Sequence, residues 1–376
     1  MRDRKTYFFV TNKDIHDILS SAKQRLTEKV LQEMLRERGI FCSPSESREK
    51  LVDRLAVLIH DYKDILAIVE RQEHARRNEK STTTTLGVTL TQEELKDVVS
   101  DYQASQPNES VAAHKRGQSE YVMNLGYDEI DYSKTRLLQR QPRDAAIEFF
   151  LLDGQTLVRM PATEKAREVI KQLKTRIEAK KKQPISTEDI ELTKLDSTAK
   201  RTLFFTKLIS TLPNFGYLTV SKLRVAHGHA EDDGQDGDLD DVEVDADQEI
   251  AGIVHNVALN GEHLVESQMF KDLCARGFYI TSITWRAREK TLPYKIIECH
   301  AGFEDREGGT RFRYSIQGAL RFKGGEYTKN LQYVEDAEKA TLLTMIETTA
   351  RNVLKTLVVD DESAESTQKT EEESKK

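Results

Sequence analysis

The chain has 376 residues, of which 32% are charged and 38% hydrophobic, and its formal net charge is -7. This length accommodates two or three domains, and the composition is ordinary for a water-soluble protein. The net charge excludes a protein coated in positive charge, but the charge is unevenly placed. Eleven acidic residues and no Lys or Arg lie between His227 and Ile250. The tail from Asp360 is also mostly acidic, so the remainder is mildly basic.

The three cysteines, Cys42, Cys274 and Cys299, are far apart and have neither zinc nor disulfide spacing. We therefore expect a reducing compartment, no metal and no cofactor. No apolar run approaches the roughly 18 residues of a membrane span, and the N-terminus lacks the apolar region of a signal peptide. The sequence predicts a cytoplasmic protein with no membrane partner.

The N-terminal segment has the pattern of short helices. An N-cap over residues 11–14 predicts a helix through about residue 26. Apolar residues at helical spacing over 30–35 predict a second helix, which Gly39 ends. Residues 40–46 read as an extended link and a turn into a third helix, whose apolar side begins at Leu51.

This helix–link–helix arrangement, about residues 28–58, resembles the SAP family of DNA-binding modules. The matching features are Leu31, Leu35, Arg38-Gly39-Ile40, Arg48, Leu51-Val52 and Arg54-Leu55. The resemblance implies that the loop and the start of the second helix contact the DNA backbone, because guanidinium and ammonium donors match phosphate oxygens. The implied phosphate contacts are Arg36, Arg38, Arg48, Lys50 and Arg54.

A second interpretation of the same stretch is a helical hairpin that docks on another protein. Acidic residues dilute the basic side of the hairpin, which favours this alternative. They are Glu33, Glu37, Glu46 and Glu49. DNA and a protein are therefore both expected partners of the N-terminal segment, and the two interpretations stay open at this point.

The segment after the hairpin begins with a helix over about 62–78. The Ser-Thr run 81–85 is of low complexity and is predicted to be a linker. A capping box at 91–94 opens another helix to about Tyr102, and residues 104–120 are expected to be mobile. We therefore assign residues 1–80 to a helical SAP-like domain and residues 81–144 to a helical or flexible connector.

From Ala145 the pattern changes to strands that are separated mostly by turns. Strands are predicted at 147–152, 156–160, 215–225, 253–259, 278–288, 294–303 and 310–322. Helices are predicted at 163–182, 198–211, 264–276 and 335–357, with a helical turn at 186–189. The expected fold class is α+β, with a mostly antiparallel sheet domain over 145–358 that carries its helices on one face. We expect the acidic loop 227–250 to be inserted between neighbouring strands, and the acidic tail 359–376 to be disordered.

The acidic loop contains part of a calcium-binding pattern. Asp236, Asp238 and Asp240 occupy the first, third and fifth positions, but Asp241 stands where such a loop needs glycine. We therefore favour a solvated loop over a metal site. A further hypothesis is that the loop mimics nucleic acid or shields a basic surface.

The C-terminal strands interleave aromatic residues with cations. Alternation places Arg286 and Arg288 on one face of their strand, and Arg311 and Arg313 on one face of theirs. If the two strands are neighbours, these four arginines form a cationic surface that could follow phosphates. Trp285 and Tyr314 would then point to the opposite face, which favours a place in the core.

No catalytic residues are assigned. The chain has no Gly-rich phosphate loop, no Gly-x-Ser-x-Gly elbow and no His-Glu-x-x-His. Glu298-Cys299-His300 comes nearest to a nuclease strand, with histidine in place of lysine, but simple alternation along a strand explains it better.

The leading hypothesis is therefore a DNA-binding accessory protein with sequence-tolerant phosphate contacts, in a DNA-processing or host-defence complex. The alternatives are a non-catalytic protein–protein scaffold and an enzyme, nuclease-like, whose site is assembled from distant residues.

Overall fold

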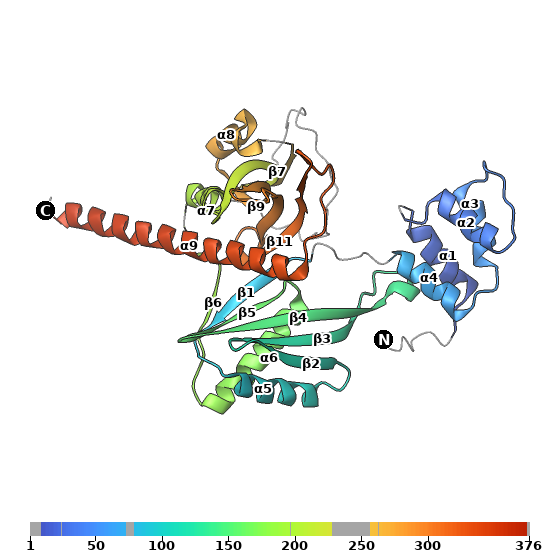
Figure 1. Ribbon diagram of the computed structural model, residues 1–376, viewed down its shortest axis with the longest axis horizontal. Coiled ribbons are helices and arrows are strands. Elements are labelled where there is room, and N and C mark those ends of the chain that lie inside the picture. The colour runs from blue at the N-terminus through green and yellow to red at the C-terminus, as the bar shows by residue number, and fades with distance from the viewer. Residues whose placement is uncertain are drawn as a thin grey trace. The chain divides into compact units, whose positions relative to one another are not determined.

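A computed structural model of the chain (Figure 1) describes residues 9–23, 25–72, 79–195, 197–227, 256–261 and 263–373. The chain divides into two compact units. The helical unit comprises residues 1–76, 103–112 and 124–145, and the sheet unit comprises residues 77–102, 113–123 and 146–376. The chain therefore passes between the two units several times, whereas the sequence pattern indicated one boundary near residue 80.

Four short helices form most of the helical unit. They are α1 (Asn12–Ser21), α2 (Glu28–Glu37), α3 (Arg48–Ala56) and α4 (Tyr62–Gln72). The expected N-cap of α1 is present, because the hydroxyl of Thr11 accepts a hydrogen bond from the backbone N–H of Asp14 at 3.2 Å. The apolar faces of the helices meet in one core. Its fully buried members include Ile18, Leu19, Leu31, Leu35, Leu51 and Leu55, each contributing about 1.5–3 kcal/mol.

The sheet unit is α+β, as expected, and within the described residues its strands form an 11-stranded, mostly antiparallel sheet. The strand order is β2-β3-β4-β5-β1-β11-β10-β9-β7-β8, with β6 paired to β1. The strands are β1 (Ser81–Leu86), β2 (Ser110–Arg116), β3 (Glu120–Ile130), β4 (Arg140–Leu152), β5 (Gln155–Pro161), β6 (Thr187–Asp189), β7 (Phe215–His227), β8 (Asn256–Asn260), β9 (Phe278–Glu289), β10 (Ile296–Asp305) and β11 (Thr310–Leu320). A separate hairpin pairs β12 (Phe322–Lys323) with β13 (Glu326–Tyr327).

β1 joins two halves of this sheet. One edge of β1 pairs with β5 along its whole length. The other edge pairs with β11 at Ser81 and with β6 over residues 84–86. The Ser-Thr run predicted to be a linker is therefore a central strand, and that prediction was wrong. β-branched threonines favour strands, and their hydroxyls find partners here: Thr82 donates to the carbonyl of Phe312 at 2.8 Å.

Helices lie on both faces of the sheet (Figure 1), rather than on one face as expected. Thr83 of β1 and Arg159 of β5 both contact Glu347 of α9 (Asp336–Glu373), so α9 covers that face. Val158, next to Arg159, points to the other face and is fully buried. There α5 (Gln92–Ser105) and α6 (Glu164–Lys181) cover the first half, and α6 packs on β5.

The second half, β7 to β11, carries its core on the α9 side. Side chains from α7 (Thr198–Ser210), α8 (Gln268–Ala275) and α9 pack there against the strands. Trp285 and Tyr314 are fully buried in this core, as alternation indicated. The opposite face of these strands is polar, and we call it the polar face.

Several expected elements differ in the structure. The segment 81–144 is built largely from strands rather than being a helical or flexible connector. The helical turn expected at 186–189 is strand β6, which pairs with β1. The C-terminal helix runs to Glu373 instead of giving way to a disordered tail at 359, because Glu, Lys, Gln and Ala are good helix formers. Pairing with a distant strand, which a local pattern does not reveal, explains the first two differences.

Other expected elements are confirmed. The β4–β5 hairpin turns at residues 153–154, since Leu152 pairs with Gln155. β7 and β8 are antiparallel neighbours, so the acidic loop is inserted between adjacent strands as expected. The loop itself, with its partial calcium pattern, lies outside the described residues. Among the helices described, none is both long enough and apolar enough to cross a bilayer.

Candidate nucleic-acid interface

The predicted helix–link–helix consists of α2, a link over residues 38–47, and α3. Gly39 adopts a φ of +74°, which a residue without Cβ tolerates best. The N–H of Ile40 then bonds the carbonyl of Leu35 at 3.0 Å, which ends α2. α2 and α3 pack against each other and against α1. The segment has the expected order of helix, link and helix. Which of its cations can contact phosphate depends on the partners that each cation has inside the unit.

Arg48, at the start of α3, is used inside the helical unit. Its guanidinium donates to the carbonyl of Leu19 at 2.7 Å and to the carbonyl of Leu26. These acceptors belong to the end of α1 and to the loop before α2, where carbonyls lack intrahelical partners. Arg48 therefore holds three segments together, and its donors are occupied.

Arg38 and Arg54 are also engaged within the unit. Arg38 forms an ion pair with Asp64 at 2.8 Å and donates to the carbonyl of Ile59 at 3.1 Å. Arg54 forms an ion pair with Glu46 at 2.8 Å. Arg36 and Lys50 are exposed, and no ion pair is recorded for either with any described residue. Of the five cations predicted to contact phosphate, these two are available without breaking an internal contact.

A different arrangement appears on the polar face of the sheet unit, where the register aligns side chains across four strands. One row runs Lys222, Thr284, His300, Ser315 across β7, β9, β10 and β11. The next row runs Arg224, Ser282, Gly302, Arg313. In both rows small or neutral residues occupy the middle strands, with cations on β7 and, in the second row, also on β11.

The four arginines predicted in this region differ in their partners. Arg286 forms an ion pair with Glu298 at 2.7 Å, and Arg311 contacts Glu164 at 2.6 Å. The guanidinium of Arg288 lies 5.8 Å from the ring centre of Tyr327, and no carboxylate pairs with it among the described residues. β9 and β11 are not neighbours as hypothesised, because β10 lies between them. Arg286, Arg288 and Arg313 nevertheless share the polar face.

His300 lies in the middle of the first row. Its Nδ1 is 3.1 Å from the hydroxyl of Thr284, and its Nε2 is buried without a hydrogen-bond partner. Burial, followed by the charge of nearby cations, lowers the pKa of His300 to about 3. The cations are Lys80, Arg313, Arg224 and Lys222. Positive charge near this point of the face favours an anion.

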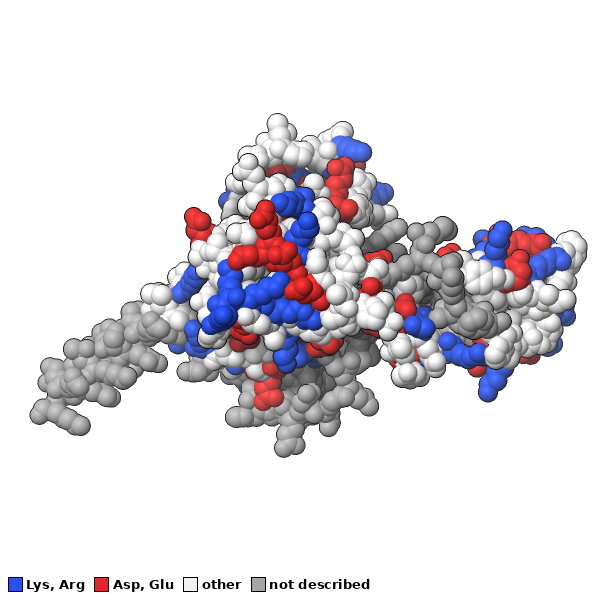
Figure 2. Space-filling model, turned by 90° about the horizontal axis from the view of Figure 1, so that it is seen from below, with Lys and Arg blue, Asp and Glu red and all other residues white. Residues whose placement is uncertain are grey.

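The surface over α5 and α6 is different in character. On the side seen from below, blue and red side chains are interleaved (Figure 2). Lys180 pairs with Asp101 at 2.7 Å, and Lys181 pairs with Glu94 at 2.9 Å. The basic end of α6, a cluster of lysines in the sequence, is thus tied to α5 by ion pairs. Its cations are matched locally and make a poor phosphate surface.

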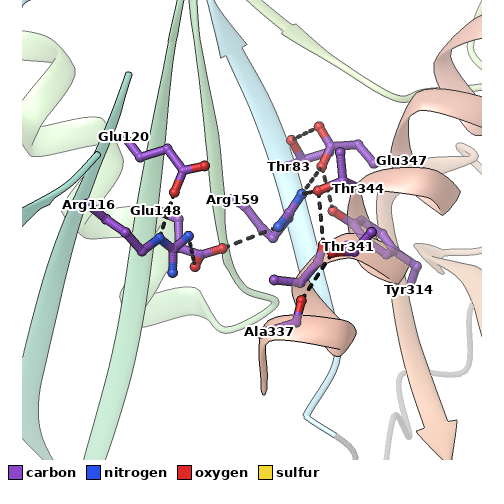
Figure 3. A network of polar contacts seen from close by, with 11 residues as sticks. Thr83, Arg116, Glu120, Glu148, Arg159, Tyr314, Ala337, Thr341, Thr344 and Glu347 are labelled. Carbon is purple, nitrogen blue, oxygen red and sulfur yellow. Dashed lines mark hydrogen bonds and ion pairs between the residues drawn. The ribbon is translucent and has the colours of Figure 1, made fainter. Parts of the chain in front are cut away.

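A buried polar network lies on the opposite, α9 side of the sheet (Figure 3). Arg159 forms ion pairs with Glu347 at 3.2 Å and with Glu148 at 3.3 Å. Tyr314 donates to Glu347 at 3.0 Å, and Thr83 donates to its other oxygen. Burial, followed by the charge of Glu347, raises the pKa of Tyr314 well above its usual value.

The network has a structural role. Arg159 and Glu347 are 3% and 2% exposed, so the network is closed to solvent. Burial by itself would lower the pKa of Arg159, but Tyr314 and the two carboxylates outweigh it and raise that pKa. Because each charge is matched and enclosed, the network joins β1, β5 and β11 to α9 rather than facing a ligand.

Sequence reasoning missed a set of surface aromatic residues beside Arg288. Tyr294, Phe322 and Tyr327 line a cavity of about 420 Å³ together with Arg288 and Lys290. A weak signal was present, because the Lys-Gly-Gly-Glu turn of the β12–β13 hairpin is flanked by Phe322 and Tyr327. Only the pairing of the strands brings these rings next to the end of β9.

No metal-binding cluster of three or more His, Cys, Asp or Glu side chains occurs among the described residues. Glu298 of the nuclease-like strand is paired with Arg286, and His300 shares its face without an acidic partner.

A scan against models of protein families found no match to the chain, and a search among curated proteins found no relative of significant similarity. The functional argument therefore depends on the geometry of the site.

Proposed function

We propose that the protein binds nucleic acid through phosphate contacts made by the polar face of β7 and β9–β11, without catalysing a reaction of its own. The observation that carries this proposal is that Lys222 and Arg313 stand on the polar face to either side of His300, and neither forms an ion pair with a described residue. Like charges held together destabilise a fold unless a counter-charge compensates them. A phosphate backbone would supply that counter-charge.

The chemistry of the rows suits a phosphate chain. Arg224 and Arg313 flank Ser282 and Gly302, which offer a hydroxyl donor and no side chain, and Lys222 lies on β7 in the neighbouring row. Strands lie about 4.8 Å apart, so the cations of β7 and β11 are roughly 14 Å from each other across the face. Contacts of this kind do not read base sequence, so the proposed binding is sequence-tolerant.

The SAP-like segment contributes a second, smaller set of contacts to this proposal. Arg36 and Lys50 are its available cations, whereas Arg38, Arg48 and Arg54 have internal partners. We also propose a role as accessory subunit of a DNA-processing or host-defence complex, supported by the cations that the polar face and the SAP-like segment offer to phosphate. DNA and a protein partner are both part of this proposal.

The test is a salt titration of DNA binding with the full chain. The variant Lys222→Glu/Arg313→Glu should bind at least about tenfold more weakly than the unaltered protein. The slope of log affinity against log salt should fall by about 2, because each lost phosphate contact removes about 0.9. The matched control is Lys134→Glu/Arg140→Glu, which changes the net charge equally but reverses cations paired with Asp131 and Asp128.

The outcomes decide the proposal directly. Equal losses in the two variants would show a general effect of net charge rather than a site. Absence of binding by the unaltered protein at low salt would overturn the proposal.

A second candidate function, protein docking by the helical unit, is favoured by one specific observation. Phe41 of the link and Ile59 of the α3–α4 loop are 85% and 95% exposed. Arg38 bonds the carbonyl of Ile59, so the start of the link and this loop are neighbours. Exposed apolar residues of this size mark interaction surfaces when they cluster. Phe41→Ser/Ile59→Ser, which changes no charge, should abolish partner capture while leaving DNA affinity unchanged.

A further inference from the structure

The polar face ends in an aromatic cavity of about 420 Å³, where Gly216 of β7 pairs with Arg288 of β9. Its walls come from separate parts of the chain: the start of β7, the turn between β9 and β10, and the β12–β13 hairpin. Tyr294 and Phe322 on these walls are 41% and 42% exposed. The volume lies in the range of small-molecule sites.

The aromatic walls are held in place by their own contacts. The hydroxyl of Tyr327 donates to the carbonyl of Tyr294 at 2.8 Å, which ties the hairpin to the turn. The rings of Phe322 and Tyr327 lie 5.0 Å apart at 57°. On the β7 side, the hydroxyl of Tyr217 bonds Glu266 at 3.1 Å. The cavity is therefore formed before a ligand arrives, which limits the entropy lost on binding.

Two cations complete the lining. Arg288 lies beside Tyr327, and Lys290 follows it on the same side of the chain. Neither has a carboxylate within ion-pair distance among the described residues, whereas Arg286 is paired with Glu298. Glu289 also borders the cavity, but its carboxylate lies 3.8 Å from Lys295, which contacts Glu338 of α9, and its Oε2 is closed to solvent. The lining thus offers π faces and two cationic donors.

We propose that this cavity holds one unpaired nucleotide, with its base against the rings of Phe322 and Tyr327 and its phosphate against Arg288 and Lys290. A planar base has the π face that aromatic side chains stack on, and the phosphate has the charge that the two cations lack.

This inference rests on the proposed function, because the cavity continues the same face. Arg288 lies six residues along β9 from Ser282, the neighbour of Arg224, so the cation-bearing face extends about 20 Å before it reaches the cavity. A strand that follows the face would bring a base to the aromatic rings. In a duplex the bases are stacked on each other and cannot enter, so the inference predicts a preference for single strands.

Two variants test the cavity, one by filling it and the other by removing an aromatic ring from its wall. Gly216→Leu fills it: an added Cβ would meet Lys290 Cε at 3.9 Å and the Arg288 carbonyl at 4.0 Å, which are ordinary contacts. Phe322→Ala removes one exposed ring. Tyr132→Ala is the matched control, because Tyr132 is an aromatic residue 80% exposed elsewhere on the chain. Thermal unfolding of each variant verifies the fold.

The measurement is the affinity of the full chain for a labelled oligothymidylate and for a duplex of equal length, at one low salt concentration. The unaltered protein should prefer the single strand, and both cavity variants should lose about tenfold in single-strand affinity. Duplex affinity should stay within twofold, and Tyr132→Ala should behave as the unaltered protein.

Two contrary results have different meanings. If both nucleic acids bind but the cavity variants bind the single strand unchanged, the cavity inference is overturned while the proposed function stands. If neither nucleic acid binds the unaltered protein, the proposed function fails and this inference fails with it.

Discussion

Arg313 and Tyr314 are adjacent in β11, yet they belong to opposite faces of the sheet with opposite electrostatic character. On the side of Tyr314, the one buried arginine, Arg159, lies between Glu148 and Glu347, so its charge is matched. On the side of Arg313, cations surround the neutral His300. On the first face the buried charges pair with one another, whereas Lys222 and Arg313 on the second face form no ion pair with any described residue. Cations without an internal partner are the better candidates for contact with a ligand.

The largest expected effect on stability comes from removing a carboxylate from the buried network on the Tyr314 side. Glu347→Ala should lower the free energy of unfolding by about 3–5 kcal/mol, because Arg159 stays buried with one partner fewer and Tyr314 loses its acceptor. Urea unfolding at neutral pH measures it. The matched control is Glu338→Ala on the same helix, whose half-exposed pair with Lys295 should be worth at most about 1 kcal/mol. Equal losses in the two variants would contradict the contrast between the faces.

An intermediate effect on stability is expected from lowering the pH, because His300 of the polar face is held neutral in the folded protein. Burial and the surrounding cations lower the pKa of His300 from 6.5 to about 3, so the folded protein keeps the imidazole neutral where the unfolded chain protonates it. The stability that depends on neutral His300 is therefore complete above about pH 6.5. It should decline by up to about 1.4 kcal/mol per pH unit between about pH 6.5 and 3.

Unfolding of the variant His300→Gln between pH 7 and 4.5 isolates this contribution. The variant should lose stability less steeply than the unaltered protein as the pH falls. His114→Gln, which removes an exposed histidine, should leave the slope as it is. Parallel curves for all three proteins would mean that His300 is not held neutral.

The smallest expected effect on stability comes from removing cations of the polar face. Lys222→Ala and Arg313→Ala should each change the free energy of unfolding by no more than about 0.5 kcal/mol, because neither forms a recorded ion pair within the described residues. Removing a cation from a like-charged group could even stabilise the fold slightly. A loss of about 2 kcal/mol or more on urea unfolding would show that these cations have a structural role after all.

Much of the fold followed from local patterns in the sequence. The alternation of β9, β10 and β11 and the helical spacing of α6 and α7 are strong because each element buries one side only. The burial of Trp285 and Tyr314 followed from the same alternation. The threonines of β1 were misassigned because a run of small polar residues resembles a linker until a neighbouring strand accepts its hydrogen bonds.

The candidate site was predictable only in part. Residue types and spacing predicted a cationic face with Arg286, Arg288, Arg311 and Arg313, since period-2 geometry is local, but Arg311 pairs with Glu164. Which cations remain available depended on partners far along the chain: Asp64 for Arg38, and the carbonyls of Leu19 and Leu26 for Arg48. Lys222 and Arg224 joined the site only because β7 pairs with β9.

The sequence by itself therefore determined the α+β class, most element types and the faces of the C-terminal strands, because these depend on neighbours within a few residues. The tertiary structure decided the order of the strands, the pairing of Arg159 with Glu347 and the aromatic cavity at the end of β9. These features depend on contacts between distant segments, such as Arg159 and Glu347, which are 188 residues apart. No short pattern encodes which distant partner a side chain will meet.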